Sequence, residues 1–266
     1  MSLPKVALIT AASSGLGAAI ARMLVVDLGM NAVINYHRNA ARAEELARSL
    51  REERVARLAG SGDGTTPEIR LIQADVSSKS DIYSLAEKAA AAFDGRLDVV
   101  ISNVGWTQVR NFADIEDGVD EDDWDRCYAA NVKSHLWLFH ACKPYLLESN
   151  KRDEGSAVFV STASVAGVKP SGSSLPYAVT KSALIHLIKS LAIISAPDIR
   201  VNSVSPGILL TEWGLSFPQE RLDAAKKANK LGRFATVEDV AEQVRTFVVS
   251  RTITGQNAVI DAGFSL

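Results

Sequence analysis

The chain has 266 residues, a formal net charge of −2, 47% hydrophobic side chains and 23% charged side chains. This is an ordinary globular composition, and a chain of this length can bury most of its apolar surface without disulfides or metals. A charge so close to zero excludes the strong positive field that recruits nucleic acid. We find no apolar stretch of the about 20 residues that a membrane span needs, so we expect no membrane partner.

Cysteine and histidine do not form the patterns of a metal site. Cys127 and Cys142 are the only cysteines and lack CxxC spacing, so we expect reduced thiols in a cytoplasmic protein. The four histidines form no HxxxH or HExxH pair, and we therefore predict no metal. A strand-like run that begins at Lys5 leaves no room for a signal peptide, which also favours the cytoplasm.

Short β-branched runs alternate with longer amphipathic segments along the chain. Some runs are apolar at consecutive positions, as Val99, Val100 and Ile101 are, which is typical of parallel strands covered on both faces. Alternating strands and helices predict parallel strands joined by right-handed crossovers. We therefore expect an α/β fold: a Rossmann-type, doubly wound, mainly parallel seven-stranded sheet with helices on both faces.

The expected elements follow one another without a break in composition. Strands are expected at residues 5–10, 32–35, 69–74, 97–102, 156–161, 200–205 and 257–261. Helices are expected at residues 17–28, 40–58, 79–93, 123–147, 175–195 and 237–249. Ser77 occupies the N-cap position before the third helix. Because no repeat or linker divides the chain, residues 1–266 are expected to form a single domain.

Two segments depart from this alternation. Residues 60–66 (GSGDGTT) predict a flexible polar loop, an exposed insertion without a function of its own. Residues 208–231 are too long for an ordinary connection, so we interpret them as a substrate lid or as a packed extra helix. Trp213 and Phe217 in this segment either line an aromatic, mostly apolar pocket or pack the segment onto the body, and both interpretations stay open.

A nucleotide-binding loop is predicted directly after the first strand, where the sequence reads TAASSGLG. Free N–H groups and the dipole at the start of the next helix attract a pyrophosphate, and glycines let it approach the backbone. The loop also lies beside the switch point of a doubly wound sheet, where ligands bind. The cofactor contacts expected here are Thr10, Ser13, Ser14, Gly15, Leu16 and Gly17.

The end of the second strand decides which form of the nucleotide is bound. A carboxylate there accepts from the ribose 2′-OH of NAD, whereas a nearby arginine favours the 2′-phosphate of NADP. The sequence has Tyr36, His37 and Arg38 at this point and no carboxylate. We therefore predict NADP(H) rather than NAD(H), with the alternative that Arg38 is a solvated surface cation.

Further cofactor contacts are expected after the third and fourth strands. Asp75 and Val76 follow the third strand, and the Asp75 carboxylate either accepts from the adenine amino group or caps the next helix. Asn103 and Gly105 follow the fourth strand, and Gly105 lets the backbone lie close to the cofactor. Trp106 comes next and is expected near the nicotinamide.

Tyr177 and Lys181 are four residues apart on a predicted helix and so share one face. A phenol has a pKa of about 10 and is a poor proton acceptor at neutral pH. A lysine ammonium about 5 Å away, at an effective dielectric constant of about 20, favours the phenolate by roughly 3 kcal/mol, near two pKa units. The pair therefore predicts general acid–base catalysis by Tyr177.

Two further polar residues are candidates for the same site. Ser164 ends the fifth strand, and its hydroxyl either donates to a carbonyl oxygen that becomes an alkoxide or belongs to an ordinary turn. Asn131 lies inside the helix expected at 123–147, where its side chain needs a partner such as a backbone carbonyl or a bound water. With a water as that partner, a proton relay would extend from Lys181 to solvent.

With these positions together, the chain resembles the short-chain dehydrogenase/reductase family over essentially its whole length, in the common single-domain branch. Five features of the sequence carry the resemblance. The TGxxxGxG motif aligns with Thr10, Ala11, Gly15 and Gly17, and the NNAG motif with residues 102–105. The Asn–Ser–Tyr–Lys tetrad falls on Asn131, Ser164, Tyr177 and Lys181. A Pro-Gly-x-x-x-Thr segment matches Pro206, Gly207 and Thr211, and the C-terminal tail resembles residues 254–263.

The resemblance implies a role for each member of the tetrad. In such enzymes the tyrosine exchanges a proton with the substrate oxygen, the serine positions that oxygen, and the lysine holds the nicotinamide ribose and acidifies the tyrosine. The asparagine supports a water. The cofactor supplies the hydride chemistry. By the same resemblance, the backbone of Ile208 and the hydroxyl of Thr211 meet the carboxamide and diphosphate, and the protein is a homodimer or homotetramer.

The chain departs from the family pattern at four positions. Ala11 replaces the first glycine of its motif; if the backbone there has a positive φ, the Cβ costs about 1 kcal/mol and weakens cofactor binding. Ser102 and Val104 replace the first Asn and the Ala of NNAG. Ala262 replaces a glycine near the C-terminus. None of these changes removes a catalytic group.

The leading functional interpretation is hydride transfer between NADP(H) and a carbonyl or secondary alcohol of a small-molecule substrate, with ketone reduction as the favoured direction. One alternative is reduction of an imine or an activated double bond by the same residues. Another is a nucleotide-binding regulator without turnover. The intact tetrad argues against that alternative, and Ala11 is the one feature in its favour.

Overall fold

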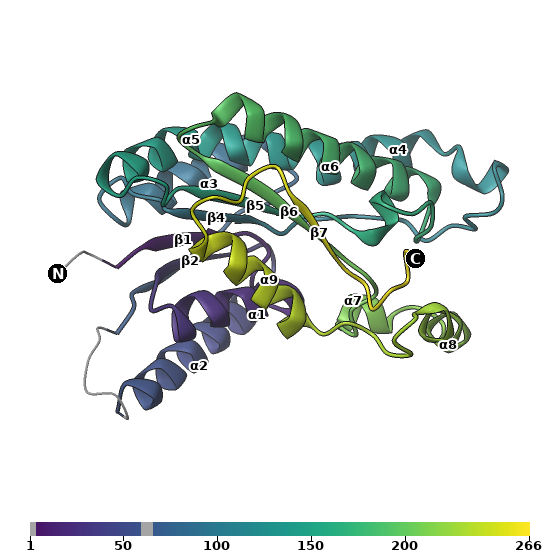
Figure 1. The fold of residues 1–266 in the computed structure, drawn as a ribbon, viewed down its shortest axis with the longest axis horizontal. Coiled ribbons are helices and arrows are strands. Elements are labelled where there is room, and N and C mark those ends of the chain that lie inside the picture. The colour runs from purple at the N-terminus through teal and green to yellow at the C-terminus, as the bar shows by residue number, and fades with distance from the viewer. Residues whose placement is uncertain (1–3, 60–65) are drawn as a thin grey trace.

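The computed structural model describes residues 4–59 and 66–266, and its centre is a seven-stranded sheet in which every neighbouring pair of strands is parallel (Figure 1). The strands are β1 (Val6–Ile9), β2 (Asn31–Tyr36), β3 (Ile69–Gln73), β4 (Val99–Ser102), β5 (Val158–Thr162), β6 (Arg200–Pro206) and β7 (Asn257–Ile260). Their order is β3-β2-β1-β4-β5-β6-β7, with the switch point between β1 and β4. This topology confirms the predicted fold class.

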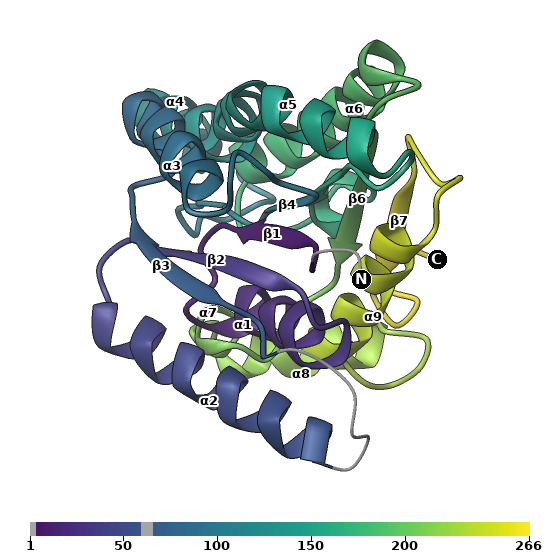
Figure 2. The same cartoon turned by 90° about the vertical axis from the view of Figure 1, so that its left-hand side faces the viewer.

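Helices cover both faces of the sheet. They are α1 (Gly15–Arg22), α2 (Ala40–Ala59), α3 (Lys79–Ala91), α4 (Glu121–Tyr128), α5 (Ser134–Arg152), α6 (Leu175–Ser195), α7 (Glu212–Leu215), α8 (Gln219–Ala228) and α9 (Val237–Val249). Side chains of α3, α5 and α6 form one core with the sheet, and side chains of α1, α2 and α9 form the other. Figure 2 shows these two layers on opposite sides of the strands.

The two cores explain why the strands are apolar at consecutive positions. Leu8 belongs to the core beneath α3, α5 and α6, whereas its neighbours Ala7 and Ile9 belong to the opposite core. Successive side chains of a strand point to opposite faces, and both faces are covered here. All four residues of β1 are therefore at most 2% exposed.

Two helices contain a wide turn that the sequence did not predict. The helix expected at 17–28 is α-helical to Arg22 and continues as a π-helical turn over Met23–Asp27. The helix expected at 123–147 starts at Glu121, passes through a π-helical turn over Ala129–Lys133, and continues as α5 to Arg152. A single such turn leaves the apolar pattern on either side intact, so periodicity does not reveal it.

The start of α3 differs by one residue from the expectation. Its N-cap is Ser78, whose hydroxyl accepts from the N–H of Asp81, and not Ser77. Ser77 belongs to the preceding turn, where its N–H and hydroxyl both donate to the Asp75 carboxylate. A carboxylate two residues before a serine competes for that serine as a turn partner.

The segments that departed from the alternation have different outcomes. The loop expected at 60–66 lies, except for its last residue, outside the described residues. The segment 208–231 contains two helices, α7 and α8, where one was expected at most.

One helix was also misjudged from the sequence. Within the described part of the chain, α6 alone is long and apolar enough to cross a membrane, judged by length and composition, whereas our search of the sequence found no such stretch. It packs against β6 and its side chains enter the core, so we assign it as a core helix.

Candidate active site

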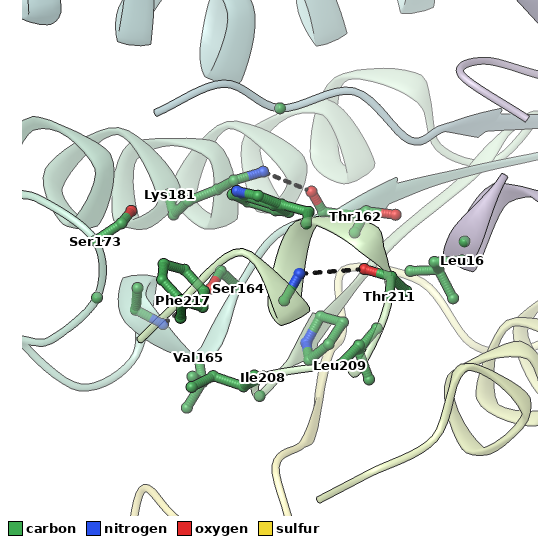
Figure 3. A pocket seen from close by; sticks show the side chains of 18 of the residues that line it. Leu16, Thr162, Ser164, Val165, Ser173, Lys181, Ile208, Leu209, Thr211 and Phe217 are labelled. Atoms are coloured by element: carbon green, nitrogen blue, oxygen red, sulfur yellow. Dashed lines mark hydrogen bonds between the residues drawn. The ribbon is translucent and has the colours of Figure 1, made fainter. Parts of the chain in front are cut away.

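A pocket of about 500 Å³ opens at the carboxyl ends of the central strands. Residues that follow β1, β4, β5 and β6 form its base, and α6 and the segment 208–231 contribute its sides (Figure 3). Ligands of doubly wound sheets bind at this edge, beside the switch point. Most residues predicted for the site meet in this one pocket.

Tyr177, Lys181 and Ser164 all line the pocket. Tyr177 and Lys181 lie one turn apart on α6, which begins at Ser174 because that hydroxyl accepts from the N–H of Tyr177 and Pro176 follows in the first turn. Ser164 lies in the turn after β5, and its hydroxyl is near enough to Tyr177 to act on the pKa of that phenol. The predicted convergence of these three side chains is present in the structure.

Asn131, the fourth member of the tetrad, lies completely buried behind the pocket in the π-helical turn. Its Oδ1 accepts from the N–H of Trp106 at 2.7 Å, and its Nδ2 donates to the Trp106 carbonyl at 2.9 Å. Nδ2 also lies 3.0 Å from the hydroxyl oxygen of Thr180 on α6. The partner that this buried amide requires is thus the backbone after Gly105, which Asn131 holds against α6.

Trp106, expected near the nicotinamide, packs beside the pocket and is not one of its lining residues. Its ring is absent from the pocket lining and packs towards α4, with the Arg126 guanidinium 4.1 Å from the ring centre. The Cys127 thiol contacts its carbonyl. The ring also packs against a small apolar cluster that includes Tyr177 and Ala178 of α6, so Trp106 stays beside Tyr177.

Burial controls the acid–base properties of the Tyr177–Lys181 pair. The Lys181 Nζ lies 5.7 Å from the centre of the Tyr177 ring and donates to the Thr162 carbonyl at 2.9 Å (Figure 3). Burial raises the pKa of Tyr177 to about 12, although the hydrogen bond from Ser164 acts to lower it. Burial also lowers the pKa of Lys181 to about 7. The predicted depression of the Tyr177 pKa is therefore wrong for this structure, because desolvation outweighs the lysine.

The loop after β1 has the shape that the approach of a phosphate requires. Gly15 has a φ of +54°, and a Cβ on Gly17 would lie 2.6 Å from the Ala11 carbonyl oxygen, so only glycine fits at Gly17. Ala11 itself has a φ of +48°, which makes the anticipated strain real. Ala11, Ser14, Gly15 and Leu16 line the pocket. Ser13 is not part of the lining, and Thr10 lies buried beneath the loop.

The ends of β1, β4 and β5 are tied together under the pocket. The N–H of Asn103 donates to the Thr10 hydroxyl at 2.9 Å, and the Asn103 Oδ1 accepts from the Thr162 hydroxyl at 2.9 Å. Gly105 lies close by, and a Cβ there would be 3.3 Å from the Lys181 Nζ. The predicted residues Asn103 and Gly105 therefore connect the nucleotide loop with the tetrad.

Asn35 is a residue of this site that our sequence reasoning missed. It is 1% exposed at the end of β2, and its Oδ1 accepts from the N–H of Ala11 at 3.0 Å. Its Nδ2 donates to the carbonyls of Ile72 and Ala74, each at 3.2 Å. An asparagine in an otherwise apolar strand was the available signal, since a buried amide must bind something.

The residues predicted to bind the adenosine end lie outside the pocket lining. Tyr36, His37 and Arg38 end or follow β2, next to Asp75 and Val76 after β3. The His37 Nε2 is 3.7 Å from an Asp75 oxygen. Hydrogen bonds from Ser77, and to a smaller extent the charges of His37 and Arg38, lower the pKa of Asp75. Asp75 thus stabilises the turn into α3, close to the capping role considered above.

The segment after β6 brings the predicted residues Pro206, Gly207, Ile208 and Thr211 to the pocket. Thr211 caps α7, with its hydroxyl accepting from the Gly214 N–H (Figure 3). A Cβ on Gly214 would lie 1.9 Å from the Leu209 carbonyl oxygen, so this tight turn requires glycine.

Trp213 and Phe217 line the pocket rather than only packing the segment onto the body. The Trp213 ring stands edge-on to Tyr177, with ring centres 6.0 Å apart and an interplanar angle of 79°. Within the described residues no group of three His, Cys, Asp or Glu side chains could hold a metal ion. The pocket therefore combines hydroxyl, ammonium and aromatic groups.

Comparison with known proteins decides the family. A family model described as enoyl-(acyl carrier protein) reductase matches residues 10–265. The human dehydrogenase/reductase SDR family member 4 is 34% identical over 265 residues, which is 97% of this chain and 87% of that protein. The chain belongs to the short-chain dehydrogenase/reductase family. It is therefore an oxidoreductase of a family that binds nicotinamide cofactors.

Solved structures of short-chain dehydrogenases/reductases share the whole fold. One from Burkholderia cenocepacia in complex with NADP gives a TM-score of 0.82 at 28% identity, covering 98% of each chain. The 3-ketoacyl-(acyl-carrier-protein) reductase of Brucella melitensis, complexed with NADH, gives a TM-score of 0.82 at 26% identity and covers 100% of each chain. Proteins of this fold thus bind either nucleotide.

Proposed function

We propose that this short-chain dehydrogenase/reductase reduces a ketone to a secondary alcohol with NADPH, reversibly, and that Tyr177 donates the proton. The observation that carries the proposal is that Ser164, Tyr177 and Lys181 line the same pocket, with Tyr177 and Lys181 one turn apart on α6. With its pKa raised to about 12, Tyr177 is protonated at neutral pH and is a proton donor. A ketone needs such a donor at its oxygen as it becomes an alkoxide.

The residues around the pocket fit a nicotinamide dinucleotide. Ser14 and Gly15 of the loop after β1 line the pocket, and the loop opens α1, whose N-terminus favours a diphosphate. Gly105 and the segment 206–211 would hold the nicotinamide end, next to Lys181. The bound nucleotide supplies the hydride for the carbonyl carbon.

Each tetrad residue then has a task in this reaction. The Tyr177 Oη gives its proton to the substrate oxygen, and the Ser164 hydroxyl donates a hydrogen bond to the same oxygen. Lys181 presents its ammonium to the ribose while it holds the Thr162 carbonyl. Asn131 is a positioning residue, because it fixes the backbone that follows Gly105.

The preference for NADP(H) rests on the end of β2. The exposed Arg38 offers positive charge to a 2′-phosphate, and no carboxylate ends this strand. The one nearby carboxylate, Asp75, is already bound by Ser77 and faces His37. This arrangement favours a phosphate over a hydroxyl at the ribose 2′ position.

We also propose that residues 208–231 are a substrate lid on a single domain formed by residues 1–266. Trp213, Phe217 and Arg221 of this segment line the pocket. Glu212 accepts two hydrogen bonds from Arg42 on α2, at 2.7 and 2.8 Å, which attaches the lid across the nucleotide side of the pocket. A small-molecule substrate would enter beneath it.

Exposed apolar side chains on α6 support the expectation of a homodimer or homotetramer. Ile193 and Ile194 are 80% and 68% exposed near the end of this helix. Large apolar groups in such a position favour association.

The two free cysteines, Cys127 and Cys142, are both buried, which agrees with a protein of the reducing cytoplasm.

The proposed function is tested with purified protein and both nucleotides. NADPH is expected to quench the protein fluorescence and to be consumed in the presence of a panel of ketones, followed at 340 nm. Tyr177→Phe is expected to bind NADPH as before and to lose nearly all turnover, whereas Tyr128→Phe, at an exposed tyrosine of α4, keeps both. Absence of binding by either nucleotide, or full activity in Tyr177→Phe, would refute the proposal.

The description of the matching family model favours one second candidate, reduction of an activated double bond. A conjugated enone presents both reactive groups in one molecule. If the enzyme reduces the carbonyl, as proposed, the product from 4-phenyl-3-buten-2-one is the allylic alcohol. If it reduces the double bond, the product is the saturated ketone, and mass spectrometry with NMR tells the two apart.

A further inference from the structure

The pocket carries one cation that the proposed reaction does not use. Four ionisable side chains line it: Tyr177, Lys181, Glu212 and Arg221. The first two belong to the reaction, and both Glu212 oxygens are occupied by Arg42. Arg221 remains, and across the described ranges 4–59 and 66–266 no carboxylate forms an ion pair with it.

Arg221 is held close to the catalytic tyrosine. It lies on α8, and its Nη2 donates to the Gly172 carbonyl at 2.7 Å. A Cβ on Gly172 would lie 3.5 Å from the ring of Tyr177, so this carbonyl belongs to the residue that borders that ring. The guanidinium also lies 4.6 Å from the centre of the Phe217 ring. These contacts fix the charged group at the substrate end of the pocket.

The chemistry of this position fits an anion. A guanidinium has five N–H donors in one plane and binds a carboxylate by two parallel hydrogen bonds. One donor of Arg221 is used by Gly172, and its neighbours in the lining are mostly apolar, among them Trp213, Phe217 and Phe234. Burial lowers the pKa of Arg221, and no neighbouring carboxylate acts to raise it. An apolar environment strengthens the attraction to a charge that a ligand brings.

We propose that Arg221 binds a carboxylate of the substrate, so that the enzyme reduces oxo acids in preference to neutral ketones. This inference rests on the proposed ketone reduction. In the step itself the carbonyl carbon gains a hydride from NADPH and the carbonyl oxygen gains the proton of Tyr177, while the carboxylate stays unchanged on Arg221. The products are a hydroxy acid and NADP⁺.

The experiment compares acids with their neutral esters. We would measure kcat/KM with NADPH for 3-oxobutanoate, 4-oxopentanoate and 5-oxohexanoate, which differ in the distance from ketone to carboxylate, and for their methyl esters. The variants are Arg221→Gln and Arg221→Lys. Lys226→Gln is the matched control, because it removes one positive charge from the exposed side of the same helix.

A second readout does not depend on turnover. Enzyme loaded with NADP⁺ cannot reduce a ketone, so 4-oxopentanoate and its methyl ester can be titrated into this complex by calorimetry. A charged hydrogen bond contributes about 1.5–3 kcal/mol, which corresponds to a roughly ten- to hundred-fold tighter binding of the acid. That preference is expected to disappear in Arg221→Gln, to persist in part in Arg221→Lys and to be unchanged in Lys226→Gln.

The outcomes separate the two proposals. If wild type prefers no acid over its ester, or if Arg221→Gln weakens acid and ester equally, then Arg221 only ties α8 to Gly172 and the inference is overturned. Ketone reduction stands in that case, because the esters are still turned over. If no ketone or ester is reduced while 4-oxopentanoate still binds through Arg221, the proposed function fails and the carboxylate site remains.

Discussion

The Asn35 side-chain oxygen accepts a hydrogen bond from the backbone N–H of Ala11 at 3.0 Å, which joins the end of β2 to the loop after β1. The same amide donates to the carbonyls of Ile72 and Ala74 at the end of β3. One buried side chain thus connects three neighbouring segments at the nucleotide side of the sheet. It holds Ala11 at a φ that alanine rarely adopts.

We expect Asn35→Ala to weaken NADPH binding at least ten-fold, because the loop loses its anchor. The change also leaves two carbonyls and an N–H without their buried partner, which costs about 1–3 kcal/mol of folding free energy for each unsatisfied group. Fluorescence titration at a temperature where both proteins are folded separates the two effects. Unchanged affinity for NADPH in a less stable protein would limit Asn35 to a role in the sheet.

Ala11 and Ala262 occupy left-handed backbone, with φ of +48° and +54°, at positions where the family has glycine. We expect Ala11→Gly and Ala262→Gly each to stabilise the protein by about 0.5 kcal/mol, since relief of about 1 kcal/mol of strain is partly offset by the freedom of glycine in the unfolded chain. Ala11→Gly is also expected to bind NADPH more tightly. Ala12→Gly, at a buried neighbour without positive φ, should destabilise instead. Thermal unfolding measures all three, and a lower Tm for Ala11→Gly would contradict the assignment of strain.

Arg38 is expected to select the phosphorylated nucleotide. In Arg38→Ala the affinity for NADPH should fall about ten-fold or more, whereas the affinity for NADH should change little, because only NADPH brings a 2′-phosphate. Arg48→Ala removes the same charge from an exposed position on α2 and serves as the control. If the affinities for NADPH and NADH fall equally, Arg38 is a solvated surface cation and does not select the nucleotide.

The pKa of Lys181, lowered to about 7 by burial, makes ketone reduction sensitive to pH. Tyr177 stays protonated up to a pKa of about 12, so Lys181 titrates first. Below about pH 7 the ammonium is present; above it the neutral amine no longer supports the alkoxide. We therefore expect kcat/KM for reduction to fall as pH rises through about 7, and a flat profile between pH 6 and 9 would contradict this.

The same shift has a consequence for stability. In the unfolded chain Lys181 keeps its ordinary pKa near 10.5, so the unfolded state binds more protons than the folded state between about pH 7 and 10.5. The stability of wild type relative to Lys181→Met should therefore rise with pH across this window. Denaturant titrations of both proteins at several pH values test the sign.

The sequence was sufficient for the fold and for the convergence of Ser164, Tyr177 and Lys181. Buried parallel strands read as continuous apolar runs, and a four-residue spacing on a helix fixes a shared face. These two signals are local, whereas the placement of Ser164 beside that helix was expected from the resemblance to the family. The glycine loop could also be recognised from the sequence, because its backbone conformation requires glycine at certain positions.

The features that the sequence did not predict all depend on contacts between distant segments. The backbone of Trp106 is held by Asn131, which comes from a helix 25 residues further along the chain. The Tyr177 pKa rises because the fold buries both Tyr177 and Lys181. A prediction made from the distance between the two groups leaves this burial out. Asn35 went unnoticed because its partners come from two other segments of the chain.

The π-helical turn over Ala129–Lys133 has a consequence for changes in chain length. A π-helical turn holds one residue more than an α-helical turn, so removing one residue here would let the helix become regular without rotating α5 relative to α4. Leu138 and Cys142 on α5 would stay buried against the sheet, whereas Asn131 would leave the position from which it binds the backbone of Trp106. A one-residue deletion within α5 itself would instead turn every later residue of the helix by about 100° and expose part of its buried face. We therefore expect a deletion in the π-helical turn to preserve the fold but to disturb the active site.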